Sequence, residues 1–263
     1  MKLFISIIFA AISVVGMAQD YSFITYSNSQ GLPQSQVQCI TQDDDGYLWV
    51  GTLGGLAKFN GKTFTTFPLE NGLFNNRISC LQHIKNTIWV GHEGGITEIV
   101  DNKAQTYSLG DNDRTVSVTD FILYQGKIVV STEGSGLYII SNKRITKVTL
   151  RNEDASTCRD LEIINNQLYI GTRDGLYFTK DLTNFKRVEA FKDRSISGIA
   201  LTKNKVFIST FFKGLFRSDF HFNRFDSIPV QANDLYIGAI NSDASNQLWL
   251  HPDVGRTQAA RSQ

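Results

Sequence analysis

A short apolar segment recurs six times along the chain at intervals of about 40 residues. The third residue of each copy is aromatic or valine, and successive copies are 40, 40, 40, 38 and 42 residues apart. These third residues are Trp49, Trp89, Val129, Tyr169, Phe207 and Trp249. A fixed period of this length is typical of repeat architectures, in which a single unit cannot bury its apolar faces alone. The chain therefore has to fold by stacking similar units on one another.

Each repeat contains the pattern of four short strands. In the first repeat, a glycine turn and a second apolar strand follow Trp49, beginning at Gly54-Gly55-Leu56. Another apolar strand precedes it at 37–41, and a fourth is expected at 63–67. Turn pairs such as Asp45-Gly46 join neighbouring strands, as short hairpins require. Four antiparallel strands in about 40 residues predict one blade of a β-propeller.

The fold class expected from this pattern is all-β, a β-propeller of four-stranded blades with about five and a half blades present. Helical solenoids have similar periods, but they need an apolar spacing of about 3.6 residues, whereas these units alternate with a period of two. The blades are predicted near 37–67, 78–108, 118–149, 159–189 and 196–226, with a partial unit at 236–250.

Both ends of the repeat array indicate an incomplete or truncated ring. Residues 23–26 followed by Gly31-Leu32 align with 64–67 followed by Gly72-Leu73, which predicts an outer closing strand at 21–26. Such a strand completes the last blade of a ring and removes its open edge. After Leu250 the repeat pattern stops, so 251–263 are expected to be an atypical tail. The alternative is a six-bladed ring in which 254–260 supply a third strand, although their sequence is a poor strand former.

The first 18 residues have the pattern of a secretory signal peptide. Lys2 gives a positive start, residues 3–15 are apolar, and Gly16-Met17-Ala18 is a small-x-small cleavage site. The apolar run of about 13 residues is too short to cross a bilayer as a helix. We therefore expect cleavage after Ala18 and a soluble, periplasmic mature chain.

The net charge bears on possible partners, and the cysteine count bears on possible disulfide bonds. The formal net charge is +1, which gives no electrostatic reason to expect nucleic acid as a partner. The three cysteines, Cys39, Cys80 and Cys158, are an odd number and cannot all pair internally. Cys39 and Cys80 occupy near-equivalent places in successive repeats with apolar neighbours. They are predicted to be small buried core residues.

The first repeat also resembles a known family of propeller repeats. The segments that carry the resemblance are Gly31-Leu32-Pro33, 42–52, Gly54-Gly55-Leu56 and Phe59-Asn60-Gly61. They closely resemble the two-component regulator propeller repeat, and the unit starting at Gly72-Leu73 repeats the pattern well. The resemblance extends from about residue 21 to 250. It weakens in later units, where Ser131 and Ser209 replace the glycine after the second strand.

This resemblance implies a role in signal transduction. Propellers of that family form the periplasmic part of hybrid two-component histidine kinases of Bacteroidetes. Two seven-bladed propellers commonly precede a β-sandwich, a membrane helix, a kinase and a DNA-binding regulator, and the usual signals are oligosaccharides released from glycans. The resemblance thus implies an N-terminal sensor fragment without a kinase of its own. Its expected partners are an oligosaccharide, further propeller and kinase domains, and in the intact receptor a second copy of the same protein.

Ligand-contacting residues are expected on one rim of the propeller. This rim carries the loops between second and third strands and the connections between blades. Arginine, glutamate and exposed aromatic side chains there suit a sugar through hydrogen bonds and ring stacking. The candidates are Arg77, His92, Glu93, Arg173, Phe211, Phe212 and Lys213. For each of them, ordinary packing or solvation is the alternative.

Catalytic, metal and cofactor sites are not indicated. The chain has no Gly-x-Ser-x-Gly elbow, His-Glu-x-x-His helix or glycine-rich phosphate loop. His92-Glu93 is the one rim pair that could perform acid–base chemistry. The acidic run Asp43-Asp44-Asp45 falls where two strands join, so a turn is favoured over a calcium loop. The alternatives to a sensor are a secreted scaffold propeller that binds proteins and a propeller carbohydrate-active enzyme.

Overall fold

The computed structural model describes residues 24–110, 116–150, 154–229, 237–252 and 258–260. The signal peptide, residues 21–23 of the expected closing strand and residues 254–257 of the alternative third strand lie outside these ranges. Within them the chain is all-β, with five four-stranded sheets and one three-stranded sheet. Every sheet has its strands in chain order and antiparallel.

The strands of the first three sheets have the following bounds. The first sheet contains β1 (Val37–Gln42), β2 (Leu48–Thr52), β3 (Gly55–Phe59) and β4 (Phe64–Phe67). The second contains β5 (Ile78–Ile84), β6 (Thr87–His92), β7 (Gly95–Val100) and β8 (Lys103–Ser108). The third contains β9 (Ser117–Tyr124), β10 (Lys127–Glu133), β11 (Gly136–Ser141) and β12 (Arg144–Val148).

The remaining sheets continue the same plan. The fourth contains β13 (Cys158–Ile164), β14 (Gln167–Thr172), β15 (Gly175–Thr179) and β16 (Lys186–Arg187). The fifth contains β17 (Ile196–Leu201), β18 (Val206–Thr210), β19 (Gly214–Ser218) and β20 (Phe225–Ile228). The sixth contains β21 (Ile237–Ser242), β22 (Leu248–Pro252) and β23 (Gln258–Ala260). The short 3-10 turns are η1 (Asn28–Gln30), η2 (Leu69–Asn71), η3 (Asp154–Ser156) and η4 (Glu189–Phe191).

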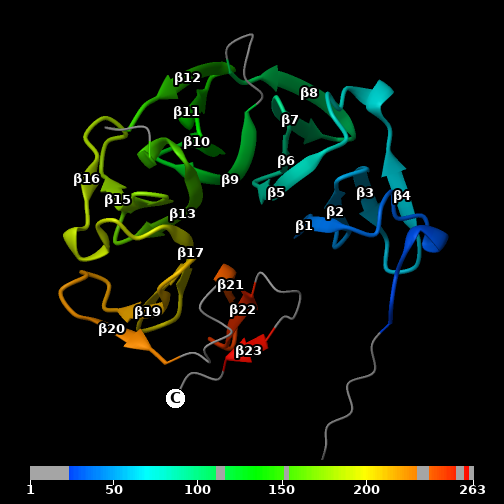
Figure 1. Ribbon diagram of the computed structural model, residues 1–263. Coiled ribbons are helices and arrows are strands. Elements are labelled where there is room, and N and C mark those ends of the chain that lie inside the picture. The colour runs from blue at the N-terminus through cyan, green and yellow to red at the C-terminus, as the bar shows by residue number, and fades with distance from the viewer. Residues whose placement is uncertain (1–23, 111–115, 151–153, 230–236, 253–257, 261–263) are drawn as a thin grey trace, which may run out of the picture.

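The six sheets are arranged like blades around a common axis, with the first strand of each innermost (Figure 1). Inner strands of successive blades pack side by side, from β1 against β5 through to β17 against β21. The apolar clusters lie in the seams between blades; one of them joins Trp49 and Leu56 of blade 1 to Leu81 and Val90 of blade 2. The predicted β-propeller is therefore confirmed.

The two ends of the array differ from the sequence-based expectation. No strand forms over residues 24–26, the described part of the expected closing strand, and Tyr26 instead packs edge-on against Phe59 with ring centroids 5.0 Å apart. At the other end, β22 continues to Pro252 and β23 pairs with it, so strands extend into the expected tail. Pairing to β22 gives the three-residue segment 258–260 hydrogen-bond partners that its own sequence does not predict.

Blade 1 has one face without a neighbouring blade in the described structure. Ile40 on β1 is 58% exposed, whereas the corresponding Leu81 and Phe121 of the next two blades are buried. Among the described residues, no packing between β21 and β1 compares with that between successive inner strands. The described blades therefore form an open arc, whose first sheet exposes part of an apolar face.

Adjacent blades approach each other closely at Gly51 of β2 and at Gly91 of β6, each the next-to-last residue of its strand. A Cβ added to Gly51 would lie 2.5 Å from Ile78 Cγ2, and one added to Gly91 would lie 2.8 Å from Val118 Cβ. Only glycine fits such a seam without displacing its neighbours. Blade 3 has Ser131 at this position, and its hydroxyl lies 2.8 Å from the Thr119 hydroxyl. This hydroxyl pair lies within blade 3, and Thr119 Oγ1 in turn donates to the Cys158 carbonyl of blade 4 at 2.8 Å.

We expect the substitution Gly91→Ser to lower the free energy of unfolding by about 2–3 kcal/mol, because the new Cβ meets Val118 across the seam. The matched change Ser131→Ala adds no atom to the seam, because residue 131 already has a Cβ there. It removes one hydroxyl contact, which should lower the free energy of unfolding by about 0.5–1.5 kcal/mol. Urea unfolding of both variants measures the difference. A loss for Gly91→Ser no larger than that for Ser131→Ala would contradict the steric explanation.

Two carboxyl groups join the inner strands of blades 3, 4 and 5. Asp120 Oδ2 accepts a hydrogen bond from the Leu161 amide at 3.0 Å, and Asp160 Oδ1 accepts from the same amide at 3.1 Å. Asp160 Oδ2 also accepts from the amide of Ile199 in the next blade. Because the two carboxyl groups share one amide, they are too close for both to ionise readily. Burial raises the pKa of Asp120 to about 7 and also raises the pKa of Asp160, where the charge of Asp120 adds to the effect.

The free energy of unfolding should fall as the pH rises from about 4 to about 7. Over this range the unfolded chain has lost the proton that the folded carboxyl pair still holds, so deprotonation favours unfolding. We expect a loss of about 1–3 kcal/mol across the window. Asp160→Asn should flatten this pH dependence, as measured by urea unfolding at pH 4, 5.5, 7 and 8.

Asp226→Asn is the control, since it makes the same charge change at an exposed carboxylate. It should leave the slope unchanged. An unchanged slope in Asp160→Asn would show that the pair does not share a proton.

Candidate functional site

The rim turns between second and third strands are fixed by a repeated local hydrogen bond. In blade 1, Thr52 Oγ1 donates to the Gly55 carbonyl at 2.9 Å. The same bond is made by Thr132 to Gly136, Thr172 to Gly175 and Thr210 to Gly214, at 2.7, 2.8 and 2.9 Å. The threonine is fully buried in each case. These turns hold their shape through residues that do not face the solvent.

His92 stands in blade 2 where blades 1, 3, 4 and 5 have threonine. Its side chain is fully buried, with Nε2 3.0 Å from Thr97 Oγ1 and Nδ1 3.3 Å from the Glu93 carbonyl oxygen. Burial lowers the pKa of His92, which favours the neutral ring. The ring also stacks on Phe74 at 5.8 Å. His92 therefore lies inside the hairpin rather than on the solvent-facing surface of the rim.

Arg77 and Glu93, two other predicted rim residues, form an ion pair. Arg77 Nε lies 2.9 Å from Glu93 Oε2, and both side chains are largely exposed. Asn75 fixes the same turn by donating from Nδ2 to the Glu93 carbonyl at 3.2 Å. The structure thus places Glu93 beside Arg77 and directs the ring nitrogens of His92 away from the Glu93 carboxylate.

Phe211, Phe212 and Lys213 lie on the turn between β18 and β19, next to Arg159 of blade 4. The guanidinium carbon of Arg159 is 4.4 Å from the centre of the Phe211 ring, a cation–π distance, and Arg159 Nη2 is 3.5 Å from Glu133 Oε1. Phe212 is 66% exposed. Residues of blades 3, 4 and 5 therefore meet at Arg159, which contacts Glu133 on one side and the predicted aromatic residue Phe211 on the other.

Sequence reasoning missed Arg159, although the repeat contained a signal for it. Arg159 is the second residue of β13, and the corresponding residues of β5, β9 and β17 are the small hydroxyl residues Ser79, Thr119 and Ser197. Blades 1 and 6 have Gln38 and Gly238 at this place, so Arg159 is the one charged residue at the position in the six blades, and this anomaly could have revealed it. Arg173, the remaining candidate, is exposed on the β14–β15 turn, and its amide bonds to the Thr157 carbonyl at 3.0 Å.

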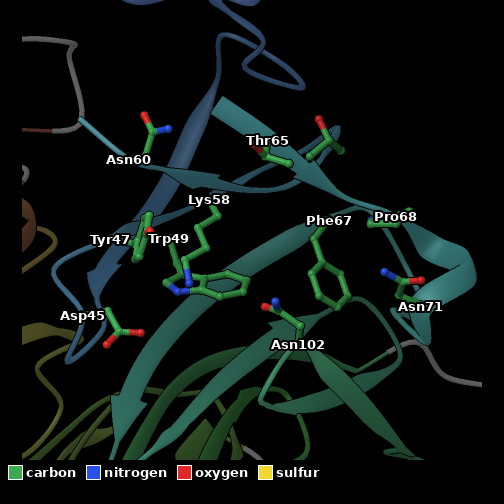
Figure 2. Close-up of a pocket in the computed structure, with 11 residues that line it drawn as sticks. Asp45, Tyr47, Trp49, Lys58, Asn60, Thr65, Phe67, Pro68, Asn71 and Asn102 are labelled. Carbon is green, nitrogen blue, oxygen red and sulfur yellow. The ribbon is translucent and has the colours of Figure 1, made fainter. Parts of the chain in front are cut away.

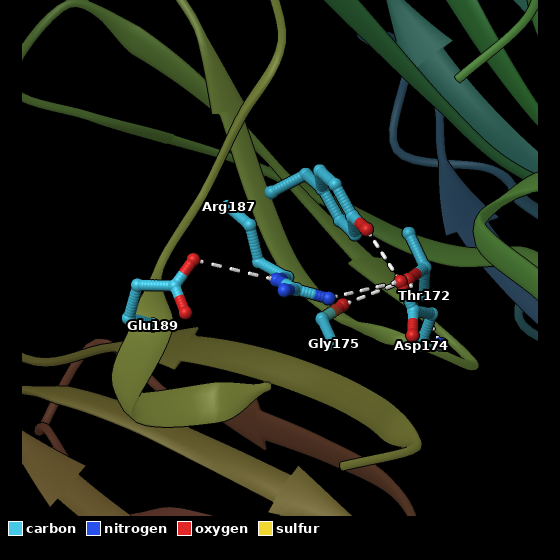
Figure 3. Close-up of polar contacts among 6 residues, drawn as sticks. Thr172, Asp174, Gly175, Arg187 and Glu189 are labelled. Atoms are coloured by element: carbon cyan, nitrogen blue, oxygen red, sulfur yellow. Dashed lines mark hydrogen bonds and ion pairs between the residues drawn. The ribbon is translucent and has the colours of Figure 1, made fainter. Parts of the chain in front are cut away.

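A polar network stabilises the rim of blade 4 (Figure 3). The Tyr177 hydroxyl donates to Asp174 Oδ2 at 2.5 Å, and Arg187 lies between Asp174 and Glu189 at 3.5 and 3.6 Å. Burial and the Asp174 carboxylate raise the pKa of Tyr177 to about 12. These charges neutralise one another and connect the β14–β15 turn to η4. The network accordingly has a structural explanation.

A second surface, here called the seam groove, lies between blades 1 and 2 (Figure 2). It is a hollow of about 510 Å³, and its lining residues include Asp45, Tyr47, Trp49, Lys58, Asn60, Thr65, Phe67, Pro68, Asn71 and Asn102. An adjoining hollow of about 350 Å³ shares Asp45, Trp49, Lys58 and Asn102 with it and adds His83 and Asp101. None of the predicted rim residues lines either hollow.

The acidic run at the groove forms a turn, as the sequence predicted. Asp43 Oδ1 accepts from the Tyr47 amide at 2.8 Å, and Oδ2 accepts from Trp49 Nε1 at 2.8 Å and lies 3.0 Å from Lys58 Nζ. Partial burial opposes ionisation, but these hydrogen bonds and the Lys58 charge hold the pKa of Asp43 below its usual value. Within the described ranges, no group of histidine, cysteine and acidic residues could hold a metal ion.

All three cysteines are free thiols, as the core assignment predicts. Cys80 and Cys158 are buried, and Cys39 is half-buried. Burial raises the pKa of the Cys39 and Cys158 thiols to about 12, so they stay protonated and unreactive at neutral pH.

We expect His92→Ala to lower the free energy of unfolding by about 1–3 kcal/mol, because Thr97 loses one of its two side-chain partners and a cavity opens in the hairpin. His92→Thr should cost less, since threonine makes the turn bond found in four other blades. Guanidinium unfolding compares the two variants. Equal losses would show that the threonine bond cannot replace the histidine contacts.

Comparison with known proteins identifies a repeat in the first blade. Residues 31–54 match the family model for the two component regulator propeller. A segment of 59 residues is 44% identical to histidine kinase P4 of Formosa agariphila. That segment is 22% of this chain and only 4% of the kinase. The resemblance found in the sequence is therefore confirmed at the first repeat.

Solved structures with a similar fold come from different functional classes. The extracellular domain of a putative hybrid two component system from B. thetaiotaomicron superposes with a TM-score of 0.60 at 20% identity, over 87% of this chain and 38% of that one. Virginiamycin B lyase from Staphylococcus aureus gives a TM-score of 0.67 at 15% identity, over 85% of this chain and 83% of the lyase. At these identities the similarity shows the propeller fold. No helix in the described ranges is long and apolar enough to span a membrane.

Proposed function

We propose that this chain is a ligand-sensing propeller of a two-component sensor, exported to the periplasm after cleavage behind Ala18, and that its signal is an oligosaccharide released from a glycan. The observation that carries the proposal is the two component regulator propeller match at residues 31–54. The identity with a histidine kinase over 59 residues supports the same assignment. In this proposal the kinase and further propeller blades belong to the complete receptor, which acts as a homodimer.

The geometry of the propeller supports a binding role. Its turns are set by buried threonines, so the side chains displayed on them are held in fixed places. Exposed aromatic residues such as Tyr47 offer surfaces for stacking on sugar rings, and amide and hydroxyl groups nearby can bond to sugar hydroxyls. The ion pair between Arg77 and Glu93 shows that rim charges are partly neutralised by their neighbours. Such a surface suits reversible recognition of a neutral, hydroxyl-rich ligand.

Titration calorimetry of the purified chain tests this function. The probes are cellotetraose, xylotetraose, mannotetraose and laminaritetraose, with product analysis by chromatography after each titration. We expect saturable heat with at least one tetrasaccharide, at a Kd below about 1 mM, and no cleavage of the sugar. Cleavage of a tetrasaccharide would indicate an enzyme instead. The absence of heat with all four would contradict sensing of neutral glycan fragments.

A further inference from the structure

We infer that the seam groove between blades 1 and 2 is a binding site for a neutral sugar unit. This inference rests on the proposed function and adds the place of binding. The groove is built from three separate parts of the chain: the β1–β2 hairpin with Asp45 and Tyr47, the β3–β4 pair with Lys58, and the β7–β8 turn with Asn102. Figure 2 shows these side chains around one hollow, with Lys58 beside the Trp49 ring. Its volume of about 510 Å³ is in the range of small-molecule sites.

Lys58 is held in place at the centre of this groove. Its Nζ lies 4.1 Å from the centre of the Tyr47 ring, 5.0 Å from that of Trp49 and 3.0 Å from Asp43 Oδ2. The Asp43 carboxylate neutralises the lysine charge, so the site does not favour an anion. An ammonium group has three N–H donors, and the protein accepts only one of them at Asp43 in the described structure. The remaining donors suit hydroxyl oxygens.

Several polar groups in the groove have no partner in the described part of the protein. The side chains of Asp45, Thr65, Asn71 and Asn102 make no hydrogen bond or ion pair with another described residue. Amides and hydroxyls that both donate and accept match the hydroxyl groups of a sugar. Tyr47, 37% exposed, adds an aromatic surface for the apolar face of the ring.

Comparison with blade 6 separates the structural part of the groove from the remainder. Trp249 Nε1 donates to Asp243 Oδ2 at 3.0 Å, which repeats the bond between Trp49 and Asp43. The Asp–Trp bond therefore occurs in blades 1 and 6, and in blade 6 it forms without a lysine beside it. In blade 1, Lys58 of β3 is paired with Trp49 of β2. At the same place in blade 6, however, Ala259 of β23 is paired with Trp249 of β22. Across the other blades this place holds Glu98, Ile139, Phe178, Arg217 and Ala259, so the blade fold does not require a lysine there. The placement of Lys58 against Tyr47, Trp49 and Asp43 is therefore specific to blade 1, and it leaves ammonium donors available to a ligand.

Calorimetry with the same four tetrasaccharides tests the groove. Tyr47→Ala removes the aromatic surface, and Asn102→Gly removes an amide while tolerating the positive φ of 60° at this turn. We expect each change to weaken binding of the responding tetrasaccharide about tenfold. Phe212→Ala removes an aromatic from the rim that is more exposed than Tyr47, 66% against 37%, and it should leave the Kd unchanged. Thermal melting of each variant establishes that it is folded.

The outcomes of this experiment distinguish the groove as the binding site from the proposed sensor function. Weakening by Tyr47→Ala and Asn102→Gly alone supports the groove. Weakening by Phe212→Ala, with both groove variants unaffected, overturns the groove and leaves the sensor function in place. If the unaltered chain binds none of the tetrasaccharides, both the groove as a site for neutral sugars and the glycan signal are wrong. If Tyr47→Ala does not fold, the result with Asn102→Gly decides.

Discussion

The close approach of neighbouring blades is the constraint on which the rest of this structure depends. The strands of each sheet pair with one another, so the blades are held together mainly by side chains packed in the seams and by bonds such as that from the Leu161 amide to Asp120. This packing leaves no room for a Cβ at Gly51 and Gly91. The period of about 40 residues follows from it, because each unit must offer the next one the same two faces.

Much of the fold could be read from the sequence because it is local and repeated. The aromatic or valine residues from Trp49 to Trp249 mark the second strand of every blade, and the glycine turns mark the hairpins. The exceptions are at the ends of the array. Residues 24–26 match the pattern of an outer strand but have no strand beside which to pair in the described structure, whereas the weak strand former 258–260 pairs with β22. A strand needs a neighbour, and the neighbour is not visible in the segment itself.

The candidate sites were harder to predict because they combine residues from different repeats. Sequence reasoning placed Phe211 and Phe212 on the rim but could not show that Arg159 of the preceding blade stacks on Phe211. It treated His92 as a surface residue, although the ring fills the place of a buried threonine. The seam groove was missed altogether, since Lys58 and Asn102 lie in different blades and become neighbours only when the blades stack. The sharing of one amide by Asp120 and Asp160 has the same origin.

The buried threonines beneath the rim turns have a consequence for how such a protein can diverge. The buried side chains of Thr52, Thr172 and Thr210 fix the conformation of their turns. The turn conformation therefore does not depend on the side chains that the turns expose to solvent. The displayed positions differ freely, from Leu53 in one blade to Arg173 and Phe212 in others. Ligand specificity can thus change through single substitutions in the turns without destabilising the blades. The same blade structure can therefore serve proteins with unrelated ligands.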